Sequence, residues 1–280
     1  MLELNKVYCK DNLELLKQIP DNYIDLIYCD ILYGTGRKFT DYQDLKPIRG
    51  EIENHYIPRI KEMHRVLKPT GSIYLQMDYR INHWLRCIMD DIFGYNNFVR
   101  EIIWENQGSM SSSRIKHQNI YFYAKTQNYI NNKLYEQYQK EKGIYQRWEK
   151  YINKNNQITK EFYPKNDSKF IPYLTKAKSN IIIDFNKKEI GSVWYISSIN
   201  NGENINYSTQ KPKALLERII KASSNENDTV ADFYMGSGTS MVVAKELNRQ
   251  FIGCDISQKA VDITNKRIEE VEKKQQENLF

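Results

Sequence analysis

Short apolar stretches alternate with helical patterns at both ends of this 280-residue chain, whereas the middle of the chain lacks that alternation. Strands alternating with helices are typical of an α/β sheet. Because the pattern flanks a central insert, we expect the two ends to complete one sheet and the insert to form a small second domain. The predicted strands are 24–29, 72–77, 98–104, 119–124, 229–233 and 250–254, and the predicted helices are 13–18, 58–67, 84–93, 212–223, 240–248 and 258–276. Lys68-Pro69-Thr70-Gly71 is predicted to end the helix 58–67, since proline and glycine stop a helix.

The composition excludes several classes of protein. The four cysteines Cys9, Cys29, Cys87 and Cys254 lie far apart without a C-x-x-C pair, so neither a zinc framework nor a secreted disulfide pattern is expected. No stretch approaches the ~18 apolar residues that cross a membrane, and the mean hydropathy is -0.70. The first residues lack the cationic patch and apolar run of a signal peptide. We therefore expect a protein of the reducing cytoplasm.

The positive charge of the chain is concentrated in the insert. The whole chain carries 41 lysines and arginines against 35 acids, and residues 131–190 hold 13 of the basic and 7 of the acidic residues. The excess in the insert therefore equals the net charge of the chain, +6. Tyrosines and a tryptophan lie among these basic residues, a pattern that suits a phosphate-rich partner. The alternative is a solvated basic face.

The clearest ligand-binding pattern is the pair of glycines in Gly236-Ser237-Gly238. The chain has only 12 glycines, and this pair lies where an apolar strand meets a helix. Glycine allows a tight turn there and lets a ligand approach the backbone at the helix N-terminus. A dinucleotide fingerprint needs a further small residue where this chain has Met241, so an NAD-dependent oxidoreductase is disfavoured. The alternative for the pair is an ordinary turn.

Two acids end predicted strands. Asp255 ends the strand after the glycine loop, where an acid accepts hydrogen bonds from ribose hydroxyls in doubly wound sheets, with a helix N-cap as the alternative. Asp30 ends an earlier strand and opens Asp30-Ile31-Leu32-Tyr33, which is followed by Gly34-Thr35-Gly36. Ligands bind at such strand ends, which makes both acids candidate site residues.

The order of these motifs along the chain resembles that of a known family. Asp30–Tyr33 comes first and the basic insert second, and Ser208-Thr209-Gln210-Lys211-Pro212 and the glycine loop come last. The chain thereby resembles the circularly permuted β-class amino-methyltransferases of DNA. Members carry a catalytic Asp-Pro-Pro-Tyr motif, then a target-recognition region, a Gln-Lys-Pro segment and a Gly-x-Gly loop. Arg65–Ile73 is similar to their central helix-to-strand segment, so the resemblance covers nearly all of the chain outside the insert.

The resemblance implies a fold, a cofactor and a partner. The fold is a Rossmann-like methyltransferase α/β sheet, mostly parallel with one antiparallel strand, formed by residues 1–130 and 191–280, with 131–190 as the inserted target-recognition region. The cofactor is S-adenosylmethionine and the substrate is double-stranded DNA, with no metal; a homodimer and a cognate restriction endonuclease stay open as partners. The implied cofactor site comprises Asp11, Asn12, Asp30, Thr209, Lys211, Asp232, Phe233, Tyr234, Gly236, Ser237, Gly238, Thr239 and Asp255.

Some of these positions have more specific or competing interpretations. By resemblance, Asp11 and Asn12 lie toward the adenine ring of the cofactor. Lys211 is either a cofactor-side residue or a surface charge. His117, at the end of the polar stretch 107–118, is expected to face DNA rather than to act in catalysis.

The catalytic motif departs from the family, because its two prolines are replaced by Ile31 and Leu32. The exocyclic nitrogen of adenine or cytosine is conjugated with its ring and is a poor nucleophile. By resemblance, the Asp30 side chain and the Ile31 carbonyl accept its two N–H bonds and localise its lone pair, while Tyr33 stacks on the target base. The carbonyl need not belong to proline, so we expect an active enzyme and expect Ile31→Pro with Leu32→Pro to be tolerated. A decayed, inactive motif is the alternative.

The function implied by the resemblance is site-specific methylation of the N6 amino group of adenine in duplex DNA, by base flipping, in a bacterial modification or restriction-modification system. Adenine is favoured because the motif begins with Asp, where relatives acting on cytosine usually have Ser. The alternatives are a cytosine N4 DNA methyltransferase, methylation of RNA or of a protein glutamine, and a catalytically inactive DNA-binding relative.

Overall fold

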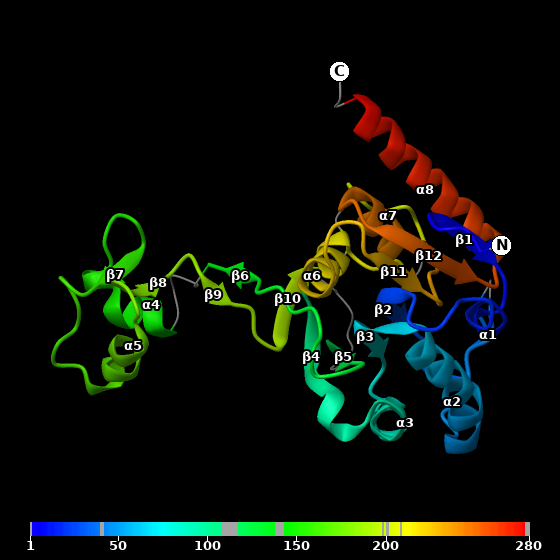
Figure 1. Cartoon of the computed structure of the whole chain (residues 1–280), viewed down its shortest axis with the longest axis horizontal. Helices are drawn as coiled ribbons and strands as arrows, with labels where there is room; N and C mark the ends of the chain where they lie inside the picture. Colours follow the sequence, from blue (N-terminus) through cyan, green and yellow to red (C-terminus); the bar gives the residue numbers. More distant parts are fainter. Residues whose placement is uncertain are drawn as a thin grey trace. The chain divides into compact units, whose positions relative to one another are not determined.

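The computed structural model describes residues 2–39, 42–107, 117–137, 143–197, 199, 202–207 and 209–277. They form two compact units (Figure 1). Unit 1 comprises Met1–Asn132 together with Ser192–Phe280, and unit 2 comprises Lys133–Gly191. Every helix among the described residues is too short or too polar to span a bilayer.

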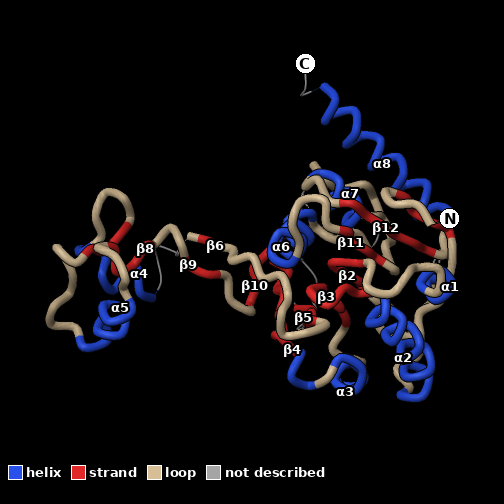
Figure 2. Tube along the Cα trace, in the orientation of Figure 1, coloured by secondary structure: helices blue, strands red, loops and turns tan. Residues whose placement is uncertain are grey.

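Unit 1 is built on an eight-stranded sheet that both ends of the chain complete (Figure 2). Its strands lie in the order β1-β12-β11-β2-β3-β5-β4-β10. Neighbouring strands pair in parallel except at β5, which is antiparallel to both β3 and β4. The predicted sheet, mostly parallel with one antiparallel strand, is confirmed. The strands are β1 (Lys6–Cys9), β2 (Ile24–Asp30), β3 (Leu67–Met77), β4 (Phe98–Gln107), β5 (His117–Ala124), β10 (Val193–Ser197), β11 (Thr229–Asp232) and β12 (Gln250–Asp255).

Helices cover both faces of this sheet. In Figure 1, α2 and α3 lie on one side of the sheet and α6 and α7 on the other. The central strands β2 and β11 are mainly apolar and are buried almost throughout, as expected for parallel strands between two helical layers. The helices of unit 1 are α1 (Asn12–Leu16), α2 (Arg49–Val66), α3 (Asn82–Phe93), α6 (Lys213–Ser223), α7 (Thr239–Glu246) and α8 (Gln258–Glu277).

Alternate side chains of β3 face opposite helical layers. Ile73 and Leu75 join the hydrophobic core with residues of α2 and α3. Tyr74 forms a 2.8 Å hydrogen bond with the Ser223 hydroxyl of α6. Because side chains alternate along a strand, Gln76 lies on the same face as Tyr74.

Helix α2 starts earlier than predicted and ends within one residue of the predicted end. The spacing of apolar residues predicts a helix over 58–67, but α2 begins at Arg49, includes Pro58 and ends at Val66. The segment Lys68–Gly71, expected to end the helix, instead lies inside β3. The chain passes directly from helix to strand at Leu67, which has extended backbone angles.

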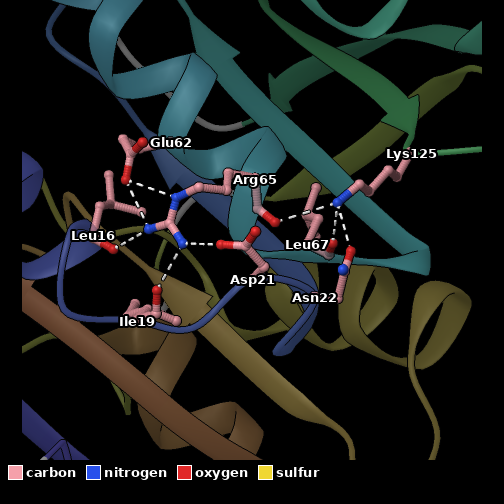
Figure 3. Close-up of polar contacts among 8 residues, drawn as sticks. All are labelled: Leu16, Ile19, Asp21, Asn22, Glu62, Arg65, Leu67 and Lys125. Carbon is pink, nitrogen blue, oxygen red and sulfur yellow. Dashed lines mark hydrogen bonds and ion pairs between the residues drawn. The ribbon is translucent and has the colours of Figure 1, made fainter.

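Side chains from neighbouring segments fix this junction (Figure 3). It lies at the amino end of β2, where Leu67 pairs with Ile24. The Lys125 ammonium donates to the Leu67 carbonyl at 2.6 Å and to the Arg65 carbonyl at 3.2 Å. Carbonyls at a helix end lack intrahelical partners, and Lys125 donates hydrogen bonds to two of them. These bonds stabilise the end of α2, a role that the sequence assigns to Lys68–Gly71. The Arg65 guanidinium in turn donates to four oxygens, the carbonyls of Leu16 and Ile19 and the carboxylates of Asp21 and Glu62.

Unit 2 has a small core of its own. Strand β6 pairs with β9 and β7 with β8, both antiparallel. The buried side chains are Tyr145, Trp148, Ile158, Phe170, Ile183 and Phe185. Four of the aromatic residues that lie among basic residues in the sequence therefore pack inward, whereas Tyr135 and Phe162 are exposed. The described lysines and arginines of the unit, except the half-buried Lys188, are exposed. The elements are β6 (Tyr135–Glu136), α4 (Gly143–Trp148), β7 (Gln157–Thr159), α5 (Ile171–Lys176), β8 (Ile181–Asp184) and β9 (Lys188–Glu189).

Candidate active site

A cavity of about 510 Å³ lies at one edge of the sheet in unit 1. Its lining includes Asp30, Asp232 and Asp255, which are the last residues of β2, β11 and β12. These three strands are neighbours in the sheet and run in parallel, so their carboxyl ends meet at the same edge. Open α/β sheets bind ligands at this edge, and the volume is in the usual range for ligand sites, roughly 300–1,000 Å³.

Most of the predicted site residues line this cavity, although their roles in binding and catalysis stay predictions. Gly238 is the exception and lies outside the lining. The lining residues from the predicted set are Asp11, Asn12, Asp30, Ile31, Tyr33, Thr209, Lys211, Asp232, Phe233, Tyr234, Gly236, Ser237, Thr239 and Asp255. The fold thus brings residues 11–33, near the start of the chain, together with residues 209–255.

Both carboxylate oxygens of Asp30 have a partner. The Tyr33 hydroxyl donates to Oδ1 at 2.7 Å. The Lys211 ammonium donates to Oδ2 and, at 3.3 Å, to the Thr209 carbonyl. The side chains of Lys211 and Asp30 are only 12% and 17% exposed, so this ion pair is largely shielded from water. Lys211 therefore lies beside the acid of the motif rather than on the open surface.

A series of polar side chains on one face of the sheet reaches Tyr33. The Tyr28 hydroxyl donates to Gln76 Oε1 at 2.7 Å, and Gln76 Nε2 donates to Gln118 Oε1. The Tyr33 hydroxyl lies 2.8 Å from the same Gln118 oxygen. Burial and the nearby Asp30 carboxylate raise the pKa of Tyr33 well above its usual value, so its hydroxyl keeps its proton near neutral pH and acts as a donor.

The segment that follows Tyr33 is tied down by the buried Asp44. Its carboxylate accepts hydrogen bonds from the backbone N–H groups of Gly34 at 3.1 Å and Thr35 at 2.8 Å, and from the Thr35 hydroxyl. Further along, the rings of Phe39 and Tyr42 stack with their centroids 4.7 Å apart, and both line the cavity. This loop therefore forms one wall of the cavity.

The Gly236-Ser237-Gly238 loop joins β11 to α7. Gly236 and Gly238 have φ angles of +51° and +71°, a backbone region that favours glycine. A Cβ on Gly238 would lie 2.2 Å from Thr264 Cγ2 of α8, so its lack of a side chain allows close packing. Asp255 Oδ2 accepts from the Gly236 N–H at 3.0 Å, and Oδ1 accepts from the Ser257 N–H at 2.9 Å. Asp255 thus lines the cavity and also holds two backbone segments, the glycine loop at Gly236 and the chain just after β12 at Ser257.

Asp232 is a deeply buried acid in the cavity wall, with 2% of its surface exposed. Ser240 Oγ donates to Oδ2 at 2.5 Å, and the Tyr234 N–H donates to Oδ1 at 3.0 Å. Burial outweighs these bonds and raises the pKa of Asp232 to about 7. Within the part of the chain that the structure describes, no basic side chain pairs with it. A cationic ligand in the cavity would stabilise its ionised form.

Arg59 of α2 connects the start of the chain to the cavity wall. Its guanidinium donates to Asp11 Oδ2 at 2.8 Å and to Asn12 Oδ1 at 2.6 Å. Asn12 Nδ2 donates in turn to the Phe233 carbonyl at 3.1 Å. Asp11 also caps α1, because its Oδ1 accepts from two backbone N–H groups of that helix. Both predicted residues therefore line the cavity and help to hold its walls together.

Several cavity residues belong to no motif recognised in the sequence. His55 lies one turn before Arg59 on α2, and its Nε2 is 3.1 Å from the Tyr234 hydroxyl. Burial and the nearby Arg59 lower the pKa of His55 to about 4, so it is neutral near pH 7. The signal that could have identified His55 and Arg59 is their four-residue spacing, which places both on one face of a helix. A helix predicted to start at Pro58 leaves out His55, so this spacing is not seen. Trp104, Gln118 and Tyr207 also line the cavity, without a local pattern.

Some expectations concern residues at or beyond the edge of what the structure describes. His117 is exposed at the start of β5, and the stretch 108–116 and Ser208 lie outside the described residues. Within the described ranges, no group of three histidine, cysteine or acidic side chains is arranged to hold a metal ion.

The chain matches known proteins along most of its length. A family model described as DNA methylase matches residues 24–266. The chain is 40% identical over 273 residues to Type II methyltransferase M2.LlaDCHI of Lactococcus lactis subsp. cremoris, covering 92% of this chain and 87% of that protein. It is 28% identical over 271 residues to DNA adenine methyltransferase YhdJ of Escherichia coli (strain K12), covering 92% of this chain and 81% of that protein.

A solved structure shows the same fold. The PvuII DNA methyltransferase (cytosine-N4-specific) superimposes with a TM-score of 0.61 at 18% identity, covering 95% of this chain and 89% of that chain. The extent of the family match, the relatives and the shared fold agree with the order of the sequence motifs. This chain belongs to the DNA methylase family of N6/N4 amino-methyltransferases.

Proposed function

We propose that this protein transfers a methyl group from S-adenosylmethionine to the N6 amino group of adenine at a specific site in double-stranded DNA. The family gives the reaction class, methylation of an amino group in DNA within a restriction-modification system. The assignment of roles to particular residues rests on one observation, the cavity that two motifs share. It is lined both by the Asp30–Tyr33 turn and by Gly236 and Ser237 of the glycine loop, so an amine and a methyl donor can meet there.

The residues of the cavity fit the methyl donor of this family, S-adenosylmethionine. When bound, it supplies a methyl group activated by a positively charged sulfur. Acids at three strand ends suit a ligand with cationic groups, and the buried Asp232, which lacks a basic partner among the described residues, is the strongest case. Asp255 would accept hydrogen bonds from ribose hydroxyls, as acids at this place do in doubly wound sheets.

Asp30 and Ile31 offer two acceptors to the target amine. A carboxylate has about four lone-pair sites, so Asp30 can accept an N–H while Tyr33 and Lys211 stay bound to it. The Ile31 carbonyl accepts no hydrogen bond from any described residue. Together these acceptors would draw the nitrogen lone pair out of conjugation and orient it, which is preorganised electrostatic catalysis.

Tyr33 is placed to receive the target base. A base inside a duplex cannot reach the cavity, so it must be flipped out and stacked on an aromatic or apolar side chain. The hydroxyl of Tyr33 is held by Asp30 and Gln118, which fixes the plane of its ring. The Lys211 ammonium lies 5.8 Å from the centroid of that ring, so it borders the same space.

Adenine is favoured over cytosine for two reasons. The motif begins with Asp30, which by resemblance is typical of enzymes acting on adenine, and the relative YhdJ is named as a DNA adenine methyltransferase. Cytosine N4 is the second candidate because the cytosine-N4-specific PvuII enzyme shares the fold.

The deciding experiment is incubation with methyl-labelled S-adenosylmethionine and mixed duplex DNA, followed by nucleoside analysis. Label in N6-methyladenine is the expected result, and label in N4-methylcytosine would establish the second candidate. Asp30→Ala is expected to lower the single-turnover rate by about a hundredfold to a thousandfold, with DNA binding and thermal unfolding little changed. Cofactor binding without any transfer by the wild type would identify an inactive relative, and full transfer by Asp30→Ala would place the catalytic centre elsewhere.

Unit 2 is the proposed target-recognition region, because its residues carry the net positive charge of the chain and its described lysines and arginines, except Lys188, are exposed. Replacing the exposed Lys154, Lys160, Lys176 and Lys178 with glutamine should weaken DNA binding and leave cofactor binding unchanged. For every DNA phosphate that a lysine no longer neutralises, the slope of log affinity against log salt should become shallower by about 0.9. The matched control makes the same charge change in α8, at Lys259, Lys266, Lys273 and Lys274. Equal slopes for the two variants would contradict a role for unit 2.

A further inference from the structure

The Asp30–Tyr33 turn contains a hydrogen bond that the proline of the family motif could not make. The Ile31 N–H donates to the Gln76 carbonyl at 3.1 Å, which continues the pairing of β2 with β3 one step past the Asp30–Gln76 pair. Proline has no N–H and cannot donate this bond. The Ile31 side chain is 3% exposed, so backbone and side chain both anchor the start of the turn.

Gln76 holds the far end of the turn through its side chain. That side chain accepts from the Tyr28 hydroxyl at 2.7 Å and donates to Gln118 Oε1, which lies 2.8 Å from the Tyr33 hydroxyl. Gln76 is completely buried, and loss of a partner in such a low-dielectric network is costly. One residue of β3 therefore restrains both ends of the turn.

The middle of the turn is restrained from α2, where the Tyr56 hydroxyl donates to the Leu32 carbonyl at 3.0 Å. Proline fixes its own φ angle, whereas isoleucine and leucine must lose backbone entropy to adopt one conformation. The hydrogen bond that the Gln76 carbonyl accepts from Ile31 and the one that Tyr56 donates to Leu32 therefore supply the restriction that two pyrrolidine rings supply in the usual motif.

We propose that Gln76 is a positioning residue for methyl transfer, and that Asp-Ile-Leu-Tyr is a working motif whose turn is held by hydrogen bonds; this rests on the proposed function. Through its backbone, Gln76 places Ile31, whose carbonyl faces the amine. Through Gln118 it places Tyr33, which orients the Asp30 carboxylate. Small misplacements of such groups lower the rate of the chemical step. On this proposal, and against the expectation from the sequence, replacing Ile31 by proline slows methyl transfer.

Two variants remove the two halves of this restraint. Ile31→Pro removes the backbone hydrogen bond and keeps the carbonyl, and Gln76→Met removes the side-chain hydrogen bonds at similar volume. Because Gln76→Met leaves the Tyr28 hydroxyl without its acceptor, it is combined with Tyr28→Phe. Ile31→Val, which retains the N–H, is the conservative comparison for the first, and Gln18→Met on the exposed surface is the matched control for the second.

Single-turnover rates at saturating cofactor and DNA, cofactor affinity by calorimetry and thermal unfolding are measured for each variant. Ile31→Pro and the Gln76→Met/Tyr28→Phe pair should each transfer about tenfold more slowly, with the cofactor Kd unchanged within about twofold. Ile31→Val, which keeps the backbone N–H, should retain most of the wild-type rate. Leu32→Pro should be about tenfold faster than Ile31→Pro, because no described hydrogen bond uses the Leu32 N–H.

A folded Ile31→Pro variant that transfers as fast as the wild type would overturn the proposal. So would a loss of rate that weaker cofactor binding or unfolding fully explains. If the wild type transfers no methyl group, the proposed function fails, but hydrogen exchange still tests whether Gln76 restrains the turn. The Ile31 amide of the wild type should exchange as slowly as the amides of β2, and about tenfold faster in the Gln76→Met/Tyr28→Phe pair. Equal exchange in the two proteins would show that Gln76 does not restrain the turn.

Discussion

Two loops leave neighbouring parallel strands and border the same cavity, but they are held in different ways. The glycine loop after β11 is shaped by positive φ angles and by the direct packing of Gly238 against Thr264. The turn after β2 contains Ile31 and Leu32 and is held by hydrogen bonds from β3 and α2. The first loop therefore depends on the backbone freedom of its own glycines as well as on contacts with Asp255 and Thr264. The second has no glycine between Asp30 and Tyr33 and depends on hydrogen bonds with other elements.

The acids of the two loops differ in the same sense. Asp30, at the start of the turn after β2, is paired with Lys211 from a segment far along the chain. Among the described residues, Asp232 before the glycine loop accepts hydrogen bonds only from the Ser240 hydroxyl of α7 and the Tyr234 N–H. Of these two acids, Asp232 is therefore the one whose negative charge the protein stabilises less and a cationic ligand would stabilise more.

Gly238→Ala should have the largest effect, because it adds a strained backbone to a steric clash. A positive φ costs an alanine roughly 1–2 kcal/mol, and overpacking costs typically about 1–3 kcal/mol more. The free energy of unfolding from urea titration should fall by the sum of these. Gly191→Ala, where a Cβ meets nothing within 4 Å, is the control. An equally small effect at both positions would show that the glycine loop is not held by its own backbone.

Asp232 should make stability fall as pH rises. Its pKa is raised from 3.8 to about 7 in the folded protein, so between about pH 4 and pH 7 the unfolded state loses its proton first and becomes relatively more stable. The loss should be about 2–4 kcal/mol across this window, from about 1.4 kcal/mol per pKa unit. Asp232→Asn should show a flatter dependence of unfolding free energy on pH, and identical profiles would contradict the pKa assignment.

Asp255→Ala should weaken cofactor binding by about tenfold to a hundredfold, since charge-assisted hydrogen bonds contribute about 1.5–3 kcal/mol. The same variant releases the Gly236 N–H, so thermal unfolding must be measured beside calorimetry. Asp262→Ala on the exposed face of α8 is the matched control. Unchanged affinity in folded Asp255→Ala would refute its assignment to the ribose.

Tyr56→Phe should have the smallest effect, because it removes one neutral hydrogen bond, that to the Leu32 carbonyl. Such a bond contributes about 0.5–1.5 kcal/mol. The single-turnover rate should fall by a few-fold while cofactor affinity stays the same, since the glycine loop is not involved. Tyr95→Phe, at an exposed tyrosine, is the control. If Tyr56→Phe instead loses cofactor affinity and keeps its transfer rate, the prediction is wrong.

Local patterns predicted the central elements of unit 1. Gly94, whose φ is +87°, caps the C-terminus of α3, and β4 and β5 contain the predicted strands 98–104 and 119–124. The predicted strands leave out the edge strands β1 and β10. Strand β1 has only four residues, whereas β10 is rich in strand-forming residues and its alternate burial is a strand pattern. Each forms a strand because a neighbouring strand offers its hydrogen-bonding edge.

The candidate site was predictable to the extent that single segments carry its chemistry. The acids at strand ends and the glycines at a strand–helix junction are visible as local patterns. The contacts of Gln76, Gln118 and Arg59 are not, because ordinary residue types on ordinary elements acquire these contacts only through the order of the strands.

The sequence by itself determined the alternation of strands and helices, the order of the motifs and the location of the charge, because residue periodicity, glycine conformation and composition are properties of short segments. Only the tertiary structure decided that Lys211 pairs with Asp30 and that Gln76 restrains the turn between Asp30 and Tyr33. The physical reason is that these partners come from different strands and loops. They meet because β12, β11, β2, β3 and β5 lie side by side in one sheet.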